Sequence, residues 1–130
     1  MEHSDPTKVA ILGAGRGGRA LLDLLHQIPS IEIVGIADRD PDAPGLQRAR
    51  TLHIPVTTNV PDLIGNHGVQ LIMDVTGNPE MEAYLKAHKP PTADILSGSA
   101  SRLLWELVQH ESKLEGELLQ AEKLAGIGSF

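Results

Sequence analysis

The sequence contains no cysteine, very few aromatic residues and fewer basic than acidic side chains. Without cysteine, the chain has no disulfide framework, no thiolate nucleophile and no cysteine-ligated zinc or iron–sulfur centre. Its aromatic residues are Trp105, Tyr84 and Phe130, too few for a base-stacking platform. The 11 Lys and Arg residues stand against 17 Asp and Glu residues, giving a formal net charge of -6. Nucleic acid is therefore not an expected partner.

Long hydrophobic runs are missing as well. No apolar stretch approaches the roughly 18–20 residues of a membrane span, and the N-terminal MEHSDPTK lacks the apolar region of a signal peptide. We therefore expect a cytoplasmic protein without a membrane span. A hydrophobic fraction of 41% in 130 residues is enough for one globular core of ordinary size.

Short apolar runs alternate with helical patterns through the first hundred residues. The runs Ile31–Ala37 and Val69–Val75 are continuous and β-branched, as in strands that are buried on both faces of a parallel sheet. Between such runs, stretches like Arg19–Gln27 and Pro79–His88 have the pattern of helices. The alternation predicts an α/β fold, a Rossmann-like doubly wound parallel sheet of about five strands.

The pattern changes at about Ser101. From there to Gly126 no proline occurs, and apolar residues recur at heptad spacing with one interruption, at Leu104, Leu107, Leu114, Leu118, Ala121 and Ala125. This spacing predicts a division into a Rossmann-like domain (1–100) and an extended signalling or coiled-coil helix (101–130) that joins a homodimer. We expect Leu103–Val108 to pack on the sheet and the rest to project. The alternative is a helix that packs back on the sheet along its whole length.

The segment KVAILGAGRGGRALLDLL has glycines at the spacing G-x-G-x-x-G, directly after a predicted strand and at the start of a predicted helix. This context is typical of a dinucleotide-binding turn. Gly13 permits the tight turn, Gly15 lets the backbone approach a pyrophosphate, and Gly18 lets helix and strand pack closely. The N–H groups at the helix start would bind the phosphates. The predicted phosphate site comprises Gly13, Ala14, Gly15, Arg16, Gly17 and Gly18.

An acidic residue follows at the expected distance. Asp38 ends the second predicted strand, twenty residues beyond Gly18, where a carboxylate accepts hydrogen bonds from the adenosine ribose. Because a 2′-phosphate would meet this carboxylate, NAD(H) is the expected cofactor. NADP(H) is the alternative, since Arg39 can pair with such a phosphate. In the other interpretation, Asp38 is an ordinary surface residue at a strand end, and the nucleotide site is empty.

Polar residues also follow the fourth predicted strand. Ligands of open α/β sheets lie beyond the carboxyl ends of the strands, so Thr76, Gly77 and Asn78 are predicted to line the nicotinamide-ribose region. A helix cap before Pro79 explains Asn78 equally well. We identify no catalytic residue and no metal site, because the six histidines are scattered along the chain without ligand spacing.

The segments VAILGAGRGGRALLDLL, IEIVGIADRD and LIMDVTGNPEMEAYLKAH resemble the N-terminal NAD(P)-binding domain of the glucose–fructose oxidoreductase family, and of dihydrodipicolinate reductase or homoserine dehydrogenase. The resemblance implies the cofactor-binding half of an NAD(P)-dependent oxidoreductase. In the oxidoreductase family, a Glu-Lys-Pro motif with a catalytic Lys follows the fifth strand. Here that stretch is ILSGSAS, without a lysine, and these 130 residues do not include the substrate domain that follows in that family.

The C-terminal LLQAEKLAGIGSF resembles the segment that opens the dimerisation and phosphoacceptor helix of two-component sensor histidine kinases. That family's phosphoacceptor lies after this segment, so we interpret the upstream pair His110-Glu111 as a solvated helix position. The main hypothesis is thus an NAD(H)-binding sensory or regulatory input domain of a histidine kinase. The oxidoreductase half is the alternative, and a Rossmann-shaped dimerisation or protein-binding module with an empty site is a third possibility.

Overall fold

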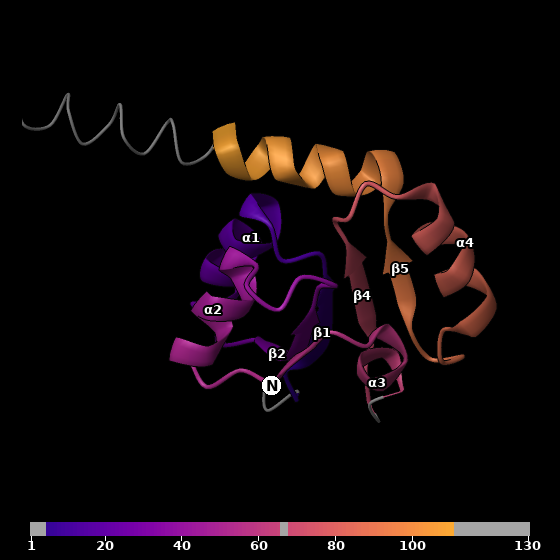
Figure 1. The fold of residues 1–130 in the computed structure, drawn as a ribbon, viewed down its shortest axis with the longest axis horizontal. Helices are drawn as coiled ribbons and strands as arrows, with labels where there is room; N and C mark the ends of the chain where they lie inside the picture. The colour runs from indigo at the N-terminus through magenta and orange to yellow at the C-terminus, as the bar shows by residue number, and fades with distance from the viewer. Residues whose placement is uncertain (1–4, 66–67, 111–130) are drawn as a thin grey trace, which may run out of the picture.

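The computed structural model describes residues 5–65 and 68–110. Strands and helices alternate along the chain (Figure 1), in the order β1 (Thr7–Leu12), α1 (Arg16–His26), β2 (Ile31–Ala37), α2 (Pro44–Thr51), β3 (Val56–Thr57), α3 (Val60–Ile64), β4 (Leu71–Asp74), α4 (Pro79–His88) and β5 (Asp94–Leu96). Residues 98–110 are helical as well and are called the C-terminal helix below.

The strands form one sheet of five in the order β3-β2-β1-β4-β5, and all its neighbouring strands run parallel. The predicted Rossmann-like α/β fold is therefore confirmed. The chain winds outward from β1 through β2 to β3, and then returns to the other side of β1 for β4. In such sheets, the crevice for ligands opens at the carboxyl ends of the two strands where the winding reverses, which here are β1 and β4.

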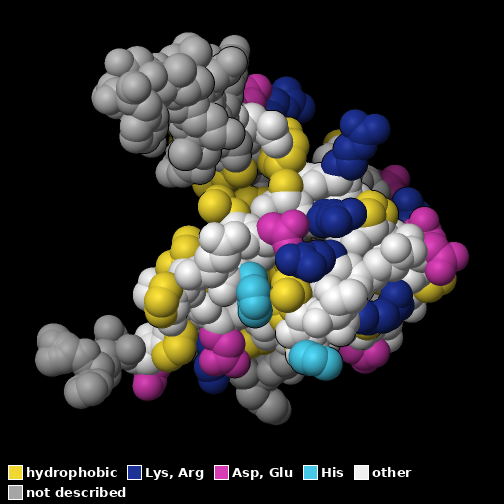
Figure 2. Space-filling model, turned by 90° about the vertical axis from the view of Figure 1, so that its left-hand side faces the viewer, with side chains coloured by type: hydrophobic (Ala, Val, Ile, Leu, Met, Phe, Trp, Pro, Cys, Tyr) yellow, Lys and Arg dark blue, Asp and Glu magenta, His cyan; other side chains and the backbone are white. Residues whose placement is uncertain are grey.

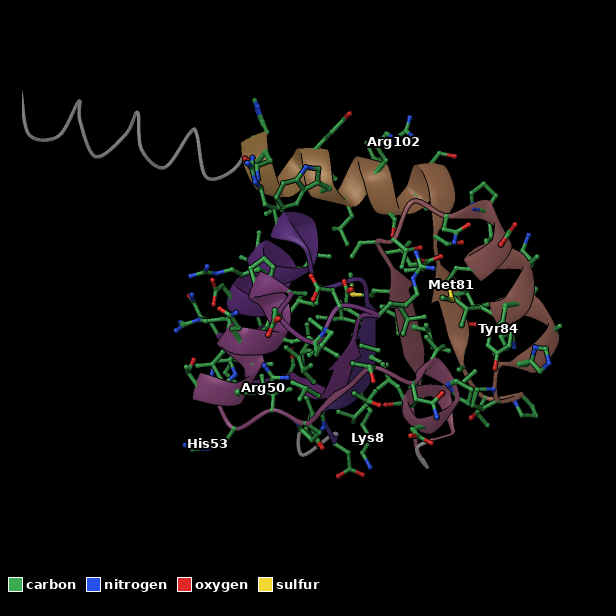
Figure 3. All side chains as sticks on the ribbon, in the orientation of Figure 1. Lys8, Arg50, His53, Met81, Tyr84 and Arg102 are labelled. Carbon is green, nitrogen blue, oxygen red and sulfur yellow. The ribbon has the colours of Figure 1, made fainter. Side chains whose placement is uncertain are left out.

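The apolar runs of the sequence become strands because both faces of the sheet are covered. Successive side chains of a strand point to opposite faces. Ile11 belongs to a core layer with Leu21 of α1 and Leu46 of α2, whereas Leu12 belongs to a second layer with Leu85 of α4. Met81 and Tyr84 of α4 pack against this second layer (Figure 3). A strand between two such layers has to be apolar at every position.

Two boundaries differ from the sequence prediction. Helix α1 begins at Arg16 rather than Arg19, because residues of the glycine motif form its first turn. The run predicted as the strand Val69–Val75 is shorter in the structure, Leu71–Asp74, although Val69 stays buried in the second core layer. Strand β3, at the edge of the sheet, has only two residues and pairs with β2 alone.

The C-terminal helix lies across the upper ends of the strands in Figure 1 and packs on the domain with one face. Leu104 and Val108 contact the α1 and α2 core layer, whereas Leu103 and Leu107 are 57% and 56% exposed. Our expectation that Leu103–Val108 packs on the sheet is thus half correct, since the helical period turns every third or fourth side chain outward. The predicted heptad residues from Glu111 onward, and the kinase-like segment, lie outside the described residues.

On the side of α1 and α2, basic and acidic side chains are interspersed on the surface (Figure 2). Within residues 5–65 and 68–110, no helix has both the length and the apolar character needed to cross a membrane.

Ser101 attaches the C-terminal helix to the sheet. Its side chain is buried, and its Oγ donates a hydrogen bond to the carbonyl oxygen of Asp74 over 2.7 Å, with the carbonyl oxygen of Leu96 3.2 Å away. Ser101→Ala leaves these carbonyls without their hydroxyl donor, and we expect it to lower the free energy of unfolding by about 1–3 kcal/mol. Urea denaturation measures this loss. The matched change at the exposed Ser99, Ser99→Ala, should alter the stability by less than about 0.5 kcal/mol; equal losses in the two variants would contradict the assignment.

Candidate functional site

The turn between β1 and α1 depends on glycine at its first position. Gly13 has a φ of 101°, a conformation that other residues rarely adopt. Its N–H donates to the carbonyl oxygen of Ala37 at the end of β2, over 2.8 Å. A Cβ at this position would lie only 3.1 Å from the backbone nitrogen of Thr76. The turn therefore brings the ends of β1, β2 and β4 together at one point.

Gly18 holds α1 against this turn. A Cβ on Gly18 would lie 1.8 Å from the carbonyl oxygen of Gly13, which leaves no room for any side chain. Gly18 is buried and lines neither of the cavities described below. Its part is the close packing of helix on turn that the sequence predicts.

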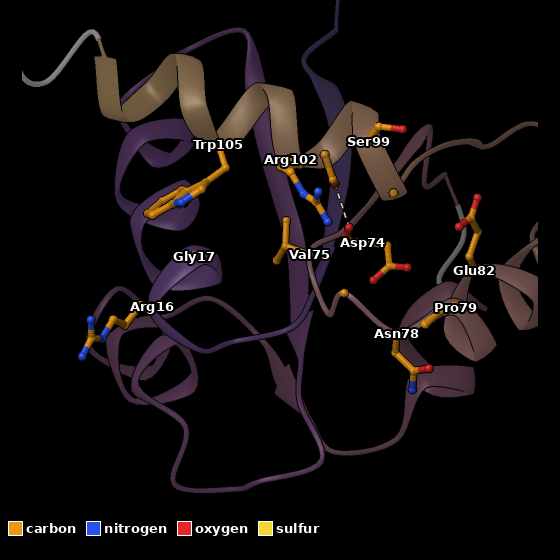
Figure 4. Close-up of a pocket in the computed structure, with 13 residues that line it drawn as sticks. Arg16, Gly17, Asp74, Val75, Asn78, Pro79, Glu82, Ser99, Arg102 and Trp105 are labelled. Atoms are coloured by element: carbon orange, nitrogen blue, oxygen red, sulfur yellow. Dashed lines mark hydrogen bonds between the residues drawn. The ribbon is translucent and has the colours of Figure 1, made fainter.

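Gly15 lies at the N-cap of α1, and its surroundings are the opposite of those of Gly18. A Cβ on Gly15 would find no atom within 4 Å, so open space adjoins the helix N-terminus. The first turn of α1 has no side-chain cap and no acidic residue. Its N–H groups are therefore available to a ligand, and the helix dipole favours an anion there. Arg16 begins the helix, but its guanidinium points away from the neighbouring cavity (Figure 4).

Asp38, just after β2, hydrogen-bonds to the backbone of the same glycine turn. Its Oδ2 accepts a hydrogen bond from the N–H of Ala14 over 2.7 Å, and its Oδ1 accepts one from the N–H of Asp40 over 2.9 Å. Each carboxylate oxygen has two lone pairs, so both oxygens retain capacity for ribose hydroxyls. The carboxylate therefore shapes the glycine turn as well as facing the predicted ligand, a role that the sequence analysis did not assign to it.

Ala14 is enclosed by the protein. Its carbonyl oxygen accepts a hydrogen bond from the N–H of Gly45 in α2 over 2.6 Å, and a Cβ on Gly45 would lie 2.7 Å from that oxygen. The N–H of Ala14 donates to Asp38 and its carbonyl oxygen accepts from Gly45, so both of its backbone groups are hydrogen-bonded within the domain. Of the predicted phosphate-site residues, Gly13, Gly15, Arg16 and Gly17 line the cavities described below, whereas Ala14 and Gly18 do not.

A cavity of about 300 Å³ opens at the ends of β1 and β2. It is lined by Gly13, Gly15, Asp38 and Arg39, and by apolar residues that include Met81. A lining that combines apolar groups with a carboxylate and a guanidinium suits a flat heterocycle joined to a sugar.

The end of β4 forms the next part of the site. The buried Asp74 accepts two hydrogen bonds at Oδ1, from the Thr76 N–H over 3.0 Å and from the Thr76 hydroxyl over 2.6 Å. Asn78 caps α4, since its Oδ1 accepts the N–H of Glu80 over 2.9 Å. The capping interpretation of Asn78 is thus correct. Its position on cavity walls leaves the binding interpretation open.

A larger cavity of about 690 Å³ lies beyond this segment, between the start of α1, the start of α4 and the C-terminal helix (Figure 4). Gly77 and Asn78 line it, together with Arg16 and Gly17. The two cavities share wall residues at Val75 and Asn78, so they adjoin. They form a crevice of two parts at the N-terminus of α1, with Gly15 on the wall of the smaller cavity and Arg16 and Gly17 on the wall of the larger one.

Sequence reasoning missed several residues of this crevice. Asp74 and Glu82 line the larger cavity, and the C-terminal helix contributes Arg102 and Trp105. The one sequence signal for any of them is that Asp74 ends the fourth apolar run, two residues before the predicted site residue Thr76. Among the described residues, no three His, Asp or Glu side chains are grouped so as to hold a metal ion.

Comparisons with known proteins agree with this geometry. No family model matches the chain. An acetaldehyde dehydrogenase of Comamonas testosteroni is 38% identical over 77 residues, which are 56% of this chain and 25% of that protein. The chain thus spans about a quarter of the length of the curated relatives it matches.

Solved structures share the fold at lower identity. GenD2 from gentamicin A biosynthesis, in complex with NAD, superposes with a TM-score of 0.58 at 20% identity, over 85% of this chain and 33% of GenD2. Myo-inositol 2-dehydrogenase from Lactobacillus plantarum superposes with a TM-score of 0.54 at 22% identity, over 82% of this chain and 34% of the enzyme. The chain has the fold of dehydrogenase nucleotide-binding domains. The comparisons favour the oxidoreductase interpretation and give no support to the histidine kinase one.

Proposed function

We propose that this chain binds a dinucleotide of the NAD(H) type, as the cofactor-binding domain of a protein related to oxidoreductases. The observation that carries the proposal is the N-terminus of α1, where no side chain caps the backbone N–H groups. Its N–H groups meet open space at Gly15, between a cavity with a carboxylate at the end of β2 and a second, larger cavity. A dinucleotide has this sequence of parts, with a pyrophosphate between two nucleosides.

In this proposal, the pyrophosphate binds at Gly15, Arg16 and Gly17. The adenosine occupies the smaller cavity, with its ribose hydroxyls on Asp38. The nicotinamide nucleoside occupies the larger cavity, beside Gly77 and Asn78, whereas Thr76, predicted for the same region, lies on the wall of the smaller cavity. Two further observations support it: the acetaldehyde dehydrogenase relative is a dehydrogenase by name, and GenD2 was solved with NAD. The proposal concerns cofactor binding alone and gives no catalytic role to Asp74 or to any other residue in 5–65 and 68–110.

Isothermal titration calorimetry with NADH, NADPH and ADP tests the proposal. We expect saturable binding of one dinucleotide per chain, with ADP binding more weakly because it lacks the second nucleoside. A folded protein that takes up none of the three would overturn the proposal in favour of a module with an empty site.

The preference between NAD(H) and NADP(H) depends on Asp38. We expect NADH to bind at least about tenfold more tightly than NADPH, because the 2′-phosphate would approach an anionic carboxylate. Asp38→Asn should shrink that ratio several-fold by weakening NADH and relieving the repulsion of NADPH. Asp42→Asn removes an equal charge from an exposed position in the same loop and should leave the ratio unchanged. Tighter binding of NADPH, lost in Arg39→Ala, would establish the NADP(H) alternative instead.

A sensory or regulatory role is the second candidate, favoured by one observation. The C-terminal helix contributes Arg102 and Trp105 to the wall of the larger cavity, while Leu103 and Leu107 on its other side are exposed. A ligand in that cavity would touch an element that leads out of the domain. Occupancy would then shift the helix only if the ligand has different affinities for its two positions.

The predicted homodimer belongs to this second candidate. Of the heptad residues in the described part of the helix, Leu104 packs on its own domain and Leu107 is exposed, so a paired helix would begin near Leu107. If the helix transmits occupancy, NADH affinity should differ between the full chain and a chain that ends before Ser101. Identical affinities would remove the sensory candidate, and the histidine kinase output with it.

A further inference from the structure

Asp74 is the most deeply buried carboxylate beside the larger cavity. It lies at the carboxyl end of β4 with only 4% of its surface exposed. Burial of a carboxylate is costly unless hydrogen bonds or a partner charge compensate it. Both hydrogen bonds to its side chain come from Thr76, and both arrive at the same oxygen, Oδ1.

The other carboxylate oxygen, Oδ2, faces the cavity. Among the described residues, it accepts no hydrogen bond from the protein, yet no fully enclosed side-chain oxygen or nitrogen in those ranges is left without a partner. Oδ2 therefore reaches open space, and the open space that Asp74 lines is the larger cavity (Figure 4). One oxygen is thus fixed by Thr76, and the other is presented as an acceptor.

The residue is also linked to the cover of the cavity. The carbonyl oxygen of Asp74 accepts the hydroxyl hydrogen of Ser101, which fixes the start of the C-terminal helix. From that helix, Arg102 and Trp105 reach the cavity wall, and Figure 4 shows both side chains on the cavity side of the helix. The same residue therefore presents an acceptor to the cavity and anchors the element that covers it.

We propose that Asp74 is a recognition residue for the second nucleoside of the bound dinucleotide, and accepts a hydrogen bond at Oδ2 from a ribose hydroxyl or the carboxamide N–H₂. The C-terminal helix closes over this half of the ligand with Trp105 and Arg102. This inference rests on the proposed function and extends it to a group that contacts the nicotinamide nucleoside. Hydrogen bonds to charged groups are the stronger ones, so the contact has a measurable effect on affinity.

The test compares the full chain with Asp74→Asn, which keeps an oxygen acceptor for Thr76 but removes the charge. The ligands are ADP, ADP-ribose and NADH. We expect ADP affinity to be unchanged, because ADP ends at the pyrophosphate, and NADH affinity to fall about tenfold or more. ADP-ribose affinity falls equally if the contact is to a ribose hydroxyl, and is unchanged if it is to the carboxamide. The matched control is Glu80→Gln, which removes a charge from an exposed position outside the cavity and should alter no affinity.

Each other outcome overturns something specific. Unchanged NADH and ADP-ribose affinities in Asp74→Asn overturn the inference alone, and so does an equal loss of ADP affinity, which would mean that Asp74 acts through the glycine turn. A wild-type chain that binds neither ADP nor NADH overturns the proposed function as well.

Trp105 gives a second measurement that needs no variant. It is the single tryptophan of the chain and lies on the cavity wall. We expect its fluorescence to change on saturation with NAD⁺, and to stay at its unliganded value on saturation with ADP. If saturating NAD⁺ leaves the emission unchanged, the second nucleoside does not lie under the C-terminal helix, and the inference is wrong even if Asp74→Asn does not fold.

Discussion

Gly18→Ala should lower the free energy of unfolding by at least about 3 kcal/mol, the largest effect on stability that we expect from any single methyl group in this chain. The added Cβ would lie 1.8 Å from the carbonyl oxygen of Gly13. Both groups are tied to backbone, so α1 as a whole would have to move away from the turn. Such a movement would also pull Leu21 and Leu22 of α1 out of the core. Urea denaturation followed by far-UV circular dichroism measures the loss.

The neighbouring glycine supplies the control. Gly17 is also in the first turn of α1, but a Cβ there would find no atom within 4 Å. Gly17→Ala should therefore leave the stability unchanged or raise it by up to about 1 kcal/mol, since alanine is the better helix former. If the two alanine variants unfold at the same urea concentration, the close packing of α1 on the glycine turn is not what stabilises this region.

Gly15→Val should abolish dinucleotide binding while the domain remains folded. The space beside Gly15 is open and its φ is −74°, while its ψ of −155° lies at the edge of the extended region, so we expect the change to cost about 1–2 kcal/mol in stability. The side chain would occupy the volume that a pyrophosphate needs at the α1 N–H groups. We expect NADH and ADP affinities to fall at least about a hundredfold, because both ligands place phosphates there. Calorimetry measures the affinities, and thermal unfolding reports on the fold.

Gly15→Ala provides a graded comparison, since one methyl group fills less of the same space. Its loss of affinity should lie between those of the wild type and the valine variant. Retention of full NADH affinity in Gly15→Val would show that the ligand does not approach the start of α1. Equal losses of stability and binding in a partly unfolded variant would show that the open space at Gly15 is needed by the fold instead.

Features that depend on residues close in sequence were predictable. The buried strands are visible as apolar runs, and the turn at Gly13 as glycines at fixed spacing, because both requirements act over a few neighbouring residues. Asp38 was placed at the end of β2 by the same logic. Its second role, in which it accepts the N–H of Ala14, joins residues 24 positions apart and leaves no local pattern.

The parts of the site that were missed come from segments that meet only in the folded chain. Arg102 and Trp105 reach the cavity because the buried Ser101 fixes the C-terminal helix over the end of β4. A heptad pattern gives apolar positions but not the surface that each one covers. Leu104 and Leu107 fit one predicted seam, yet the first packs on the domain and the second faces outward. Which face of the helix docks is decided by the sheet edge beneath it.

The short outer strands of the sheet limit the association of one copy of this domain with another at high concentration. The two outer strands, β3 and β5, have two and three residues, whereas the central β1 and β2 have six and seven. An exposed strand recruits other chains through its unpaired backbone groups, and a very short one offers few of them. The sheet therefore presents little template for growth at either margin. Short margins of this kind are expected to protect the domain against amyloid-like stacking at high concentration.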